Sequence, residues 1–146
     1  MNRKAFIVGL KKEKLSLEEK KFLIKEKPWG VILFARNIKN LAQLKVLVKN
    51  IKDIFKDKNY PILIDQEGGK VSRLNKILDF TIFSQGFFGN IYKNNHKLFL
   101  RSYKIYINAV CNILNDVGIN INTAPVLDVK KKISSNFIKD RSFSHD

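Results

Sequence analysis

The stretch PILIDQEGG, residues 61–69, joins an apolar run of four residues to a cluster of acids, an amide and two glycines. A short continuous apolar run is typical of a parallel strand that is covered on both faces. In parallel α/β folds, ligands bind beyond the carboxyl ends of the strands. The stretch therefore predicts a buried strand over residues 61–64 that carries its polar residues to a binding edge.

Upstream of this stretch, strand-like and helix-like segments alternate. Apolar runs at 5–10 (AFIVGL) and 31–35 (VILFA) predict two more strands. Between them, Ser16 and Glu19 have the spacing of a capping box, which predicts a helix that begins after Ser16 and ends near Lys27. The order of these segments indicates βα units.

The segment 41–55 carries apolar residues at helical spacing, which predicts an amphipathic helix. Its other side holds a row of lysines, namely Lys45, Lys49, Lys52 and Lys56. Such a row can contact phosphates, but no aromatic residue or arginine interleaves with it to stack on bases or read them. A solvated face is the favoured interpretation.

Downstream, residues 75–95 are predicted to be a loop with short apolar pieces. Apolar residues from Phe99 to Val117 recur at helical spacing and predict a long helix that ends at Gly118. The run 121–129 (INTAPVLDV) then predicts a fourth strand. The whole pattern predicts an α/β fold, with about four parallel strands and intervening helices, in one domain over residues 1–146.

Composition limits the fold and the partners. The chain has 146 residues, whereas a complete eight-stranded α/β barrel needs at least about 200. It holds 28 Lys and Arg against 13 Asp and Glu, a net charge of +15, which raises nucleic acid or an anionic membrane surface as partners. Most of these cations are lysines, which favours solvated surface, so we expect neither partner. The five arginines are Arg3, Arg36, Arg73, Arg101 and Arg141.

Several kinds of site are absent from the sequence. Cys111 is the only cysteine, which excludes an intramolecular disulfide and a thiolate metal cluster and fits a reducing compartment. We expect Cys111 on the buried face of its helix. His96 and His145 do not have metal-ligand spacing, His145 is expected at the surface, and no phosphate-binding glycine motif or GxSxG is present. We expect no metal and no cofactor. No signal peptide or 18-residue apolar run occurs, so we expect a cytoplasmic protein.

Three strand ends carry candidate site residues: Arg36-Asn37 after the second strand, residues 65–73 after the third, and Asp128, followed by Asp140-Arg141-Ser142-Phe143, after the fourth. In the middle group, Asp65 and Glu67 are two apart in an extended segment, so both are expected on one side, where carboxylates can accept sugar hydroxyl hydrogens.

Arg73 adds a planar set of donors to this group, and Gly68-Gly69 allows a sharp turn or the close approach of a ligand. A salt-bridged turn explains the same residues equally well. A glycosidase acid and nucleophile pair is disfavoured, because residues two apart on one strand end do not flank a scissile bond.

Four motifs follow one another along the chain: KPWGVILFARN at 27–37, PILIDQEGG at 61–69 with VSRL at 71–74, GININTAPVLDV at 118–129, and RSF at 141–143 with Asp146. In these motifs and their order, the chain resembles the N-terminal half of a glycoside hydrolase family 3 barrel. More narrowly, it is similar to the bacterial cytoplasmic β-N-acetylhexosaminidases of peptidoglycan recycling.

The resemblance implies the first half of a TIM-type (β/α)8 barrel, truncated after about four βα units. It also implies a retaining mechanism on terminal N-acetylglucosamine, in which an Asp nucleophile and an acid/base His on a mobile loop act. No catalytic residue is expected here, because the KHFPGHG-like stretch of the family does not occur in residues 1–146. The chain alone is therefore expected to be inactive. The substrate-binding residues that carry over are Asp65, Arg73 and Arg141.

Three positions depart from the family pattern: Lys70 replaces the usual Arg, Asp140 replaces the usual Glu, and residues 78–89 lack a proline. Two alternatives stay open besides the hexosaminidase. The chain could be a basic nucleic-acid-binding α/β module, or a sugar-binding remnant without catalysis. Its oligomeric state does not follow from the sequence.

Overall fold

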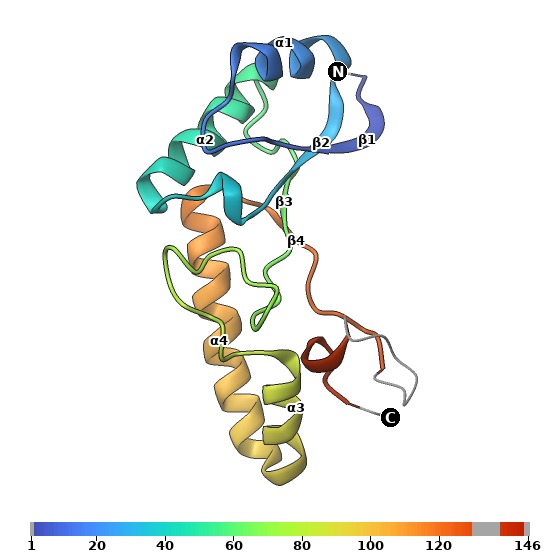
Figure 1. The fold of residues 1–146 in the computed structure, drawn as a ribbon, viewed down its shortest axis with the longest axis vertical. Coiled ribbons are helices and arrows are strands. Elements are labelled where there is room, and N and C mark those ends of the chain that lie inside the picture. Colours follow the sequence, from blue (N-terminus) through green and yellow to red (C-terminus); the bar gives the residue numbers. More distant parts are fainter. Residues whose placement is uncertain (1, 130–137, 145–146) are drawn as a thin grey trace. The chain divides into compact units, whose positions relative to one another are not determined.

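The computed structural model describes residues 2–129 and 138–144. The chain falls into two compact units (Figure 1). The first unit is formed by residues 1–64 and 113–122, and the second by residues 65–112 and 123–146. The prediction of one domain over the whole chain stays a prediction, and each unit is described by itself.

The first unit contains a sheet of four parallel strands. These are β1 (Lys4–Gly9), β2 (Pro28–Leu33), β3 (Ile62–Ile64) and β4 (Ile121–Asn122), in the order β1-β2-β3-β4. Val31 pairs with Ile62, and Leu63 pairs with Ile121. All three neighbouring pairs are parallel, which confirms the predicted α/β arrangement of four strands.

Helix α1 (Leu17–Glu26) follows β1 and begins at the predicted capping box. The Ser16 hydroxyl accepts a hydrogen bond from the Glu19 N–H at 3.0 Å. The Glu19 carboxylate accepts from the N–H groups of Ser16 at 2.8 Å and Lys11 at 2.9 Å. These bonds satisfy amide groups that a helix start leaves without partners, which confirms the predicted start.

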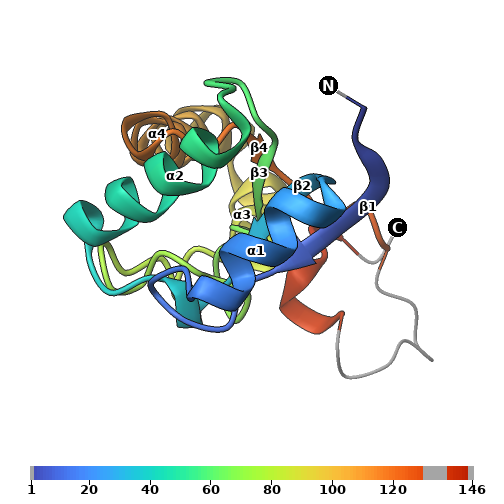
Figure 2. The same cartoon turned by 90° about the horizontal axis from the view of Figure 1, so that it is seen from above.

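Helix α2 (Leu41–Phe55) has the predicted bounds, and the short 3₁₀ helix η1 (Ala35–Asn37) precedes it. The last residues of α4, 113–117, lie beside α2 in both views (Figures 1 and 2), where Lys45 and Asp116 form an ion pair at 2.7 Å. Burial of each large apolar side chain contributes about 1.5–3 kcal/mol. The core of this unit is formed by the apolar faces of the sheet and of α2: Val31, Leu33, Leu44, Leu47, Ile51, Ile62 and Ile64.

The second unit contains α3 (Gln85–Asn94), residues 96–112 of the long helix α4 (His96–Val117), and the 3₁₀ helix η2 (Lys139–Arg141). Aromatic rings form its core. The ring of Phe88 lies 4.8 Å from that of Tyr103 and 5.1 Å from that of Tyr106. Burial raises the pKa of Tyr106 to about 12. Because these rings are packed against one another, they do not form an open stacking surface.

Helix α3 corrects the prediction of a loop over residues 75–95. Ser84 caps it by accepting from the Phe87 N–H at 3.1 Å. Gly86 and Gly89 weaken the helical pattern, because glycine disfavours helix interiors. Packing explains Gly89, since a Cβ there would lie 1.8 Å from the carbonyl oxygen of Phe143. The Ser84 cap and the aromatic spacing are the signals that the sequence prediction missed.

The predicted strands differ from the observed ones at their ends. Strand β2 begins at Pro28, three residues before the predicted start, because a proline is tolerated as the first residue of a strand. Strand β4 covers only Ile121–Asn122, not residues 121–129. Its partner β3 ends at Ile64, and Pro125 has no N–H to donate to a ladder. The fourth strand is therefore much shorter than predicted.

Cys111 is exposed, not buried as predicted. The buried face of α4 runs through Tyr106, Val110, Leu114 and Val117. Cys111 follows Val110 directly, and successive residues of a helix point about 100° apart. The side chain of Cys111 therefore points away from this apolar face.

Candidate functional site

The segment after β3 forms a tight, anchored loop in the second unit. Gly68 and Gly69 adopt φ values of +87° and +60°, which side chains other than glycine rarely adopt. A Cβ on Gly68 would lie 2.1 Å from the carbonyl oxygen of Phe83. The Glu67 N–H donates to the Val71 carbonyl at 3.0 Å. The double glycine is therefore required by both conformation and space.

Gln66 is buried and holds the next turn of this loop. Its side-chain oxygen accepts from the N–H groups of Arg73 at 2.7 Å and Leu74 at 3.1 Å. Its side-chain nitrogen donates to the Ser72 hydroxyl at 3.0 Å. The backbone at Arg73 is thereby fixed. The sequence prediction missed Gln66, although its position between two acids that were expected on one side of an extended segment places its side chain on the opposite side.

Asp65 lies beside Arg73. The Asp65 carboxylate is 3.5 Å from Nη2 of Arg73, and each side chain is about one-quarter exposed. The Thr123 hydroxyl, just after β4, donates to the same carboxylate. Thr123 was not predicted, and its place after the fourth strand was the available signal. Asp65 therefore combines a fixed hydroxyl contact with a longer, partly exposed ion pair.

Glu67 forms a bidentate ion pair with Arg141. Nε of Arg141 donates to Oε2 of Glu67 at 2.8 Å, and Nη2 donates to Oε1 at 2.7 Å. The hydrogen bonds that Arg141 donates to Glu67 raise the pKa of Arg141, burial lowers it, and the charges of Glu67, Asp128 and Asp65 raise it further. The residues predicted after the third and fourth strands thus meet in one cluster.

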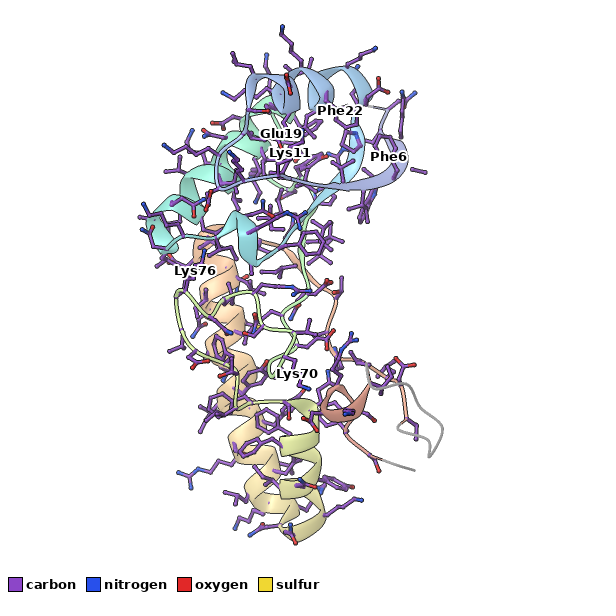
Figure 3. The ribbon with its side chains drawn as sticks, viewed as in Figure 1. Phe6, Lys11, Glu19, Phe22, Lys70 and Lys76 are labelled. Carbon is purple, nitrogen blue, oxygen red and sulfur yellow. The ribbon has the colours of Figure 1, made fainter. Side chains whose placement is uncertain are left out.

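The cluster of Asp65, Glu67, Arg73 and Arg141 holds two negative and two positive charges. These charges balance, so the cluster is suited to a neutral polar ligand more than to an anion. Carboxylates accept hydroxyl hydrogens, and guanidinium groups donate to hydroxyl or carbonyl oxygens. The ion pairs are also those of the salt-bridged turn considered above. Lys70, labelled in Figure 3, is exposed and forms no ion pair with another described residue.

Arg36 and Asn37 brace the loops of the first unit. Nε of Arg36 donates to the Leu10 carbonyl at 2.8 Å, and its guanidinium lies over the Phe34 ring. Asn37 is fully buried, accepts from the Phe34 N–H at 2.9 Å, and donates to the carbonyls of Leu10 at 3.0 Å and Lys12 at 2.9 Å. Their side chains are occupied in joining the segments after β1 and β2.

The lysine row of α2 is partly neutralised within the first unit. Lys45 pairs with Asp116 at 2.7 Å, and Lys49 pairs with Asp53 at 2.6 Å. These pairs reduce the charge that the row could offer to phosphates. Among the described residues, no three or more His, Cys, Asp or Glu side chains gather as metal ligands would, and no helix there has the length and apolarity to cross a membrane. His145 and Asp146 lie outside the described residues.

The chain belongs to glycoside hydrolase family 3, because the sequence model of the "Glycosyl hydrolase family 3 N terminal domain" matches residues 6–146. It is 36% identical to the beta-hexosaminidase of Tolumonas auensis over 140 residues, which are 90% of this chain and 37% of that protein. It is 30% identical to the beta-hexosaminidase of Haemophilus influenzae over 142 residues, which are 97% and 39% of the two chains.

Solved structures agree with this family. NagZ from Neisseria gonorrhoeae in complex with N-trifluoroacetyl-D-glucosamine matches with a TM-score of 0.83 and 26% identity, over 98% of this chain and 42% of that one. Native NagZ from the same organism matches with a TM-score of 0.84 and 28% identity, over 98% and 41%. The predicted half of a TIM-type barrel is confirmed. The chain spans about two-fifths of the length of these relatives.

Proposed function

We propose that residues 1–146 form the sugar-binding N-terminal part of a β-N-acetylhexosaminidase. The parent enzyme removes terminal β-N-acetylglucosamine from muropeptides derived from peptidoglycan by a retaining mechanism. The observation that carries the proposal is the cluster of Asp65, Arg73, Glu67 and Arg141 in a chain of this family. A solved relative in complex with a glucosamine derivative supports the ligand class.

Asp65, Arg73 and Arg141 are the residues that bind the sugar. The Asp65 carboxylate accepts hydrogen bonds from sugar hydroxyls, because a charged acceptor forms stronger bonds than a neutral one. Arg73 and Arg141 donate to hydroxyl oxygens or to the acetamido carbonyl. The Thr123 hydroxyl keeps one oxygen of Asp65 in place. The balanced charge of the cluster suits this uncharged ligand.

Bond cleavage needs groups that residues 1–146 do not supply. Retaining hydrolysis requires a nucleophile and an acid/base group placed on suitable sides of the anomeric carbon. The histidine motif that the family uses is absent from this sequence. The chain by itself therefore binds sugar without hydrolysing it. The single cysteine supports a reducing location, which we propose to be the cytoplasm.

A hybrid enzyme tests this function. Residues 1–146 are joined to the part of the Haemophilus influenzae beta-hexosaminidase that follows its matching segment, and the hybrid is assayed on 4-nitrophenyl N-acetyl-β-D-glucosaminide. We expect turnover by the hybrid and none by residues 1–146 alone. A folded hybrid without turnover would contradict the proposed activity, and turnover by residues 1–146 alone would contradict the division of roles.

Single variants of the hybrid test the three binding residues. Asp65→Ala, Arg73→Ala and Arg141→Ala should each lower kcat/KM by about 10- to 150-fold, because a hydrogen bond to a charged group contributes about 1.5–3 kcal/mol. Asp53→Ala is the matched control, since Asp53 is an exposed acid of α2 that pairs only with Lys49 in the described ion pairs. Equal losses in Asp65→Ala and Asp53→Ala would contradict the assignment.

A further inference from the structure

We propose that Glu67 is a positioning residue that holds the Arg141 guanidinium by one edge and leaves its remaining donors for the sugar. This inference rests on the proposed function, because Arg141 needs to be positioned only if the cluster binds a ligand. Glu67 itself is not assigned a contact with the sugar. Its role differs from that of Asp65, although both are acids of the same loop.

The geometry of the pair assigns one guanidinium edge to Glu67. The two bonds, at 2.8 Å and 2.7 Å, come from Nε and Nη2 of Arg141 and go to the two oxygens of the Glu67 carboxylate. A guanidinium group has five N–H donors, and this pairing uses two of them. The three others, two on Nη1 and one on Nη2, remain for a ligand. Two parallel bonds also fix the plane of the guanidinium group.

The two side chains of the pair differ in their exposure to solvent. The Glu67 side chain is 7% exposed, whereas the Arg141 side chain is 31% exposed. The Glu67 backbone is tied to Val71, and Gly68 follows in a conformation that few other residues adopt. The carboxylate therefore sits on a rigid segment, while the guanidinium group stays open to a ligand.

The backbone of Arg141 is fixed as well. With the Gln85 amide oriented so that its nitrogen faces carbonyl groups, that nitrogen donates to the Arg141 carbonyl at 2.8 Å and to the Val126 carbonyl at 2.9 Å. Arg141 is thus held at its carbonyl by α3 and at its guanidinium group by Glu67. Ordering a flexible arginine before binding lowers the entropy that binding must remove.

The pair formed by Asp65 and Arg73 has a longer contact than the pair formed by Glu67 and Arg141. Nη2 of Arg73 lies 3.5 Å from Oδ2 of Asp65, and both side chains are about one-quarter exposed. A longer contact between partly exposed groups can be exchanged for contacts with a ligand. The structure therefore assigns Asp65 to the sugar and Glu67 to Arg141.

Binding of N-acetylglucosamine to the full 146-residue chain, followed by NMR titration, tests the proposal. We expect Glu67→Gln to raise Kd at least tenfold, although Arg141 and its charge are still present, because a side-chain amide has one acceptor oxygen where the carboxylate has two, and so loses the paired geometry. The Nε–H resonance of Arg141 should lose its protection from solvent exchange in the same variant. Glu67→Asp, which keeps the charge but is one methylene shorter, should give an intermediate Kd.

The double variant Glu67→Arg with Arg141→Glu separates positioning from a purely structural ion pair. If the pair only stabilises the fold, the exchange restores both the melting temperature and the Kd. Our proposal requires that Kd is not restored, because the arginine is then at the wrong position. A restored Kd, or a Kd in Glu67→Asp equal to that of the wild type, overturns the proposal.

Two further outcomes distinguish this proposal from the proposed function. In the first outcome, the wild-type chain binds sugar and Arg141→Ala weakens binding, but Glu67→Gln does not. Positioning by Glu67 is then wrong, while the sugar site stands. If the wild-type chain shows no binding of N-acetylglucosamine, both the sugar site and the role of Glu67 are wrong.

Discussion

Replacement of Gln66 by methionine tests whether one buried amide holds the turn that carries Arg73. The two side chains have similar length, so Gln66→Met removes the polar groups and leaves little empty volume. In the wild type, the Gln66 side-chain oxygen accepts from the N–H groups of Arg73 and Leu74 at 2.7 and 3.1 Å. Methionine leaves both N–H groups without this acceptor.

The expected cost follows from these two donors. A buried donor that loses its acceptor costs about 1–3 kcal/mol. Leu74 is fully buried, whereas Arg73 is only half-buried, so the two together should cost about 3 kcal/mol. That free energy corresponds to about a 150-fold change in the folding equilibrium. Ser72 adds little to this sum, because its hydroxyl also bonds to the side chain of Asn75.

Two measurements check this value. Urea unfolding gives the change in the free energy of unfolding, and amide hydrogen exchange reports the protection of the Arg73 and Leu74 N–H groups directly. Ser72→Ala is the matched control, because it removes a partner of Gln66 but leaves both N–H groups bonded. A loss below about 0.5 kcal/mol in Gln66→Met, or a loss equal to that of Ser72→Ala, would refute the reasoning.

Two other predictions concern the helix start and the close approach at α3. Glu19→Gln should reduce the loss of stability between pH 7 and pH 3. Burial raises the pKa of Glu19, but hydrogen bonds from backbone N–H groups and the Ser16 hydroxyl lower this pKa overall. The stabilisation by the Glu19 carboxylate is therefore present above its unfolded pKa and is lost as the pH falls through its folded pKa. Ser16→Ala should cost about 1 kcal/mol by urea unfolding, and an unchanged pH dependence in Glu19→Gln would contradict the capping assignment. Gly89→Ala should cost about 1–3 kcal/mol, because its Cβ would overlap the Phe143 carbonyl. A thermal melt compares it with Gly9→Ala, whose Cβ would lie 3.1 Å from Nη2 of Arg36 and 3.2 Å from the Phe34 ring and would not overlap a backbone atom as in Gly89→Ala. Equal melting temperatures would contradict the packing.

The local elements could be predicted from the sequence because their signals lie within a few residues. The bonds between Ser16 and Glu19 join positions three apart, and the apolar stripe over residues 41–55 repeats within each helical turn. The apolar run at 61–64 followed by acids predicted the strand end, and family motifs marked Asp65, Arg73 and Arg141. The fold class and the candidate site residues were therefore available without coordinates.

Only the tertiary structure decided which of these residues meet. Glu67 and Arg141 are 74 positions apart, and no local pattern shows that they share two hydrogen bonds. The helix α3 was hidden for a related reason: Gly89 lowers its intrinsic propensity and is needed because the distant Phe143 packs against it. Contacts between residues far apart in the chain depend on how the whole unit packs. They can therefore outweigh the intrinsic preference of a segment for helix, strand or loop.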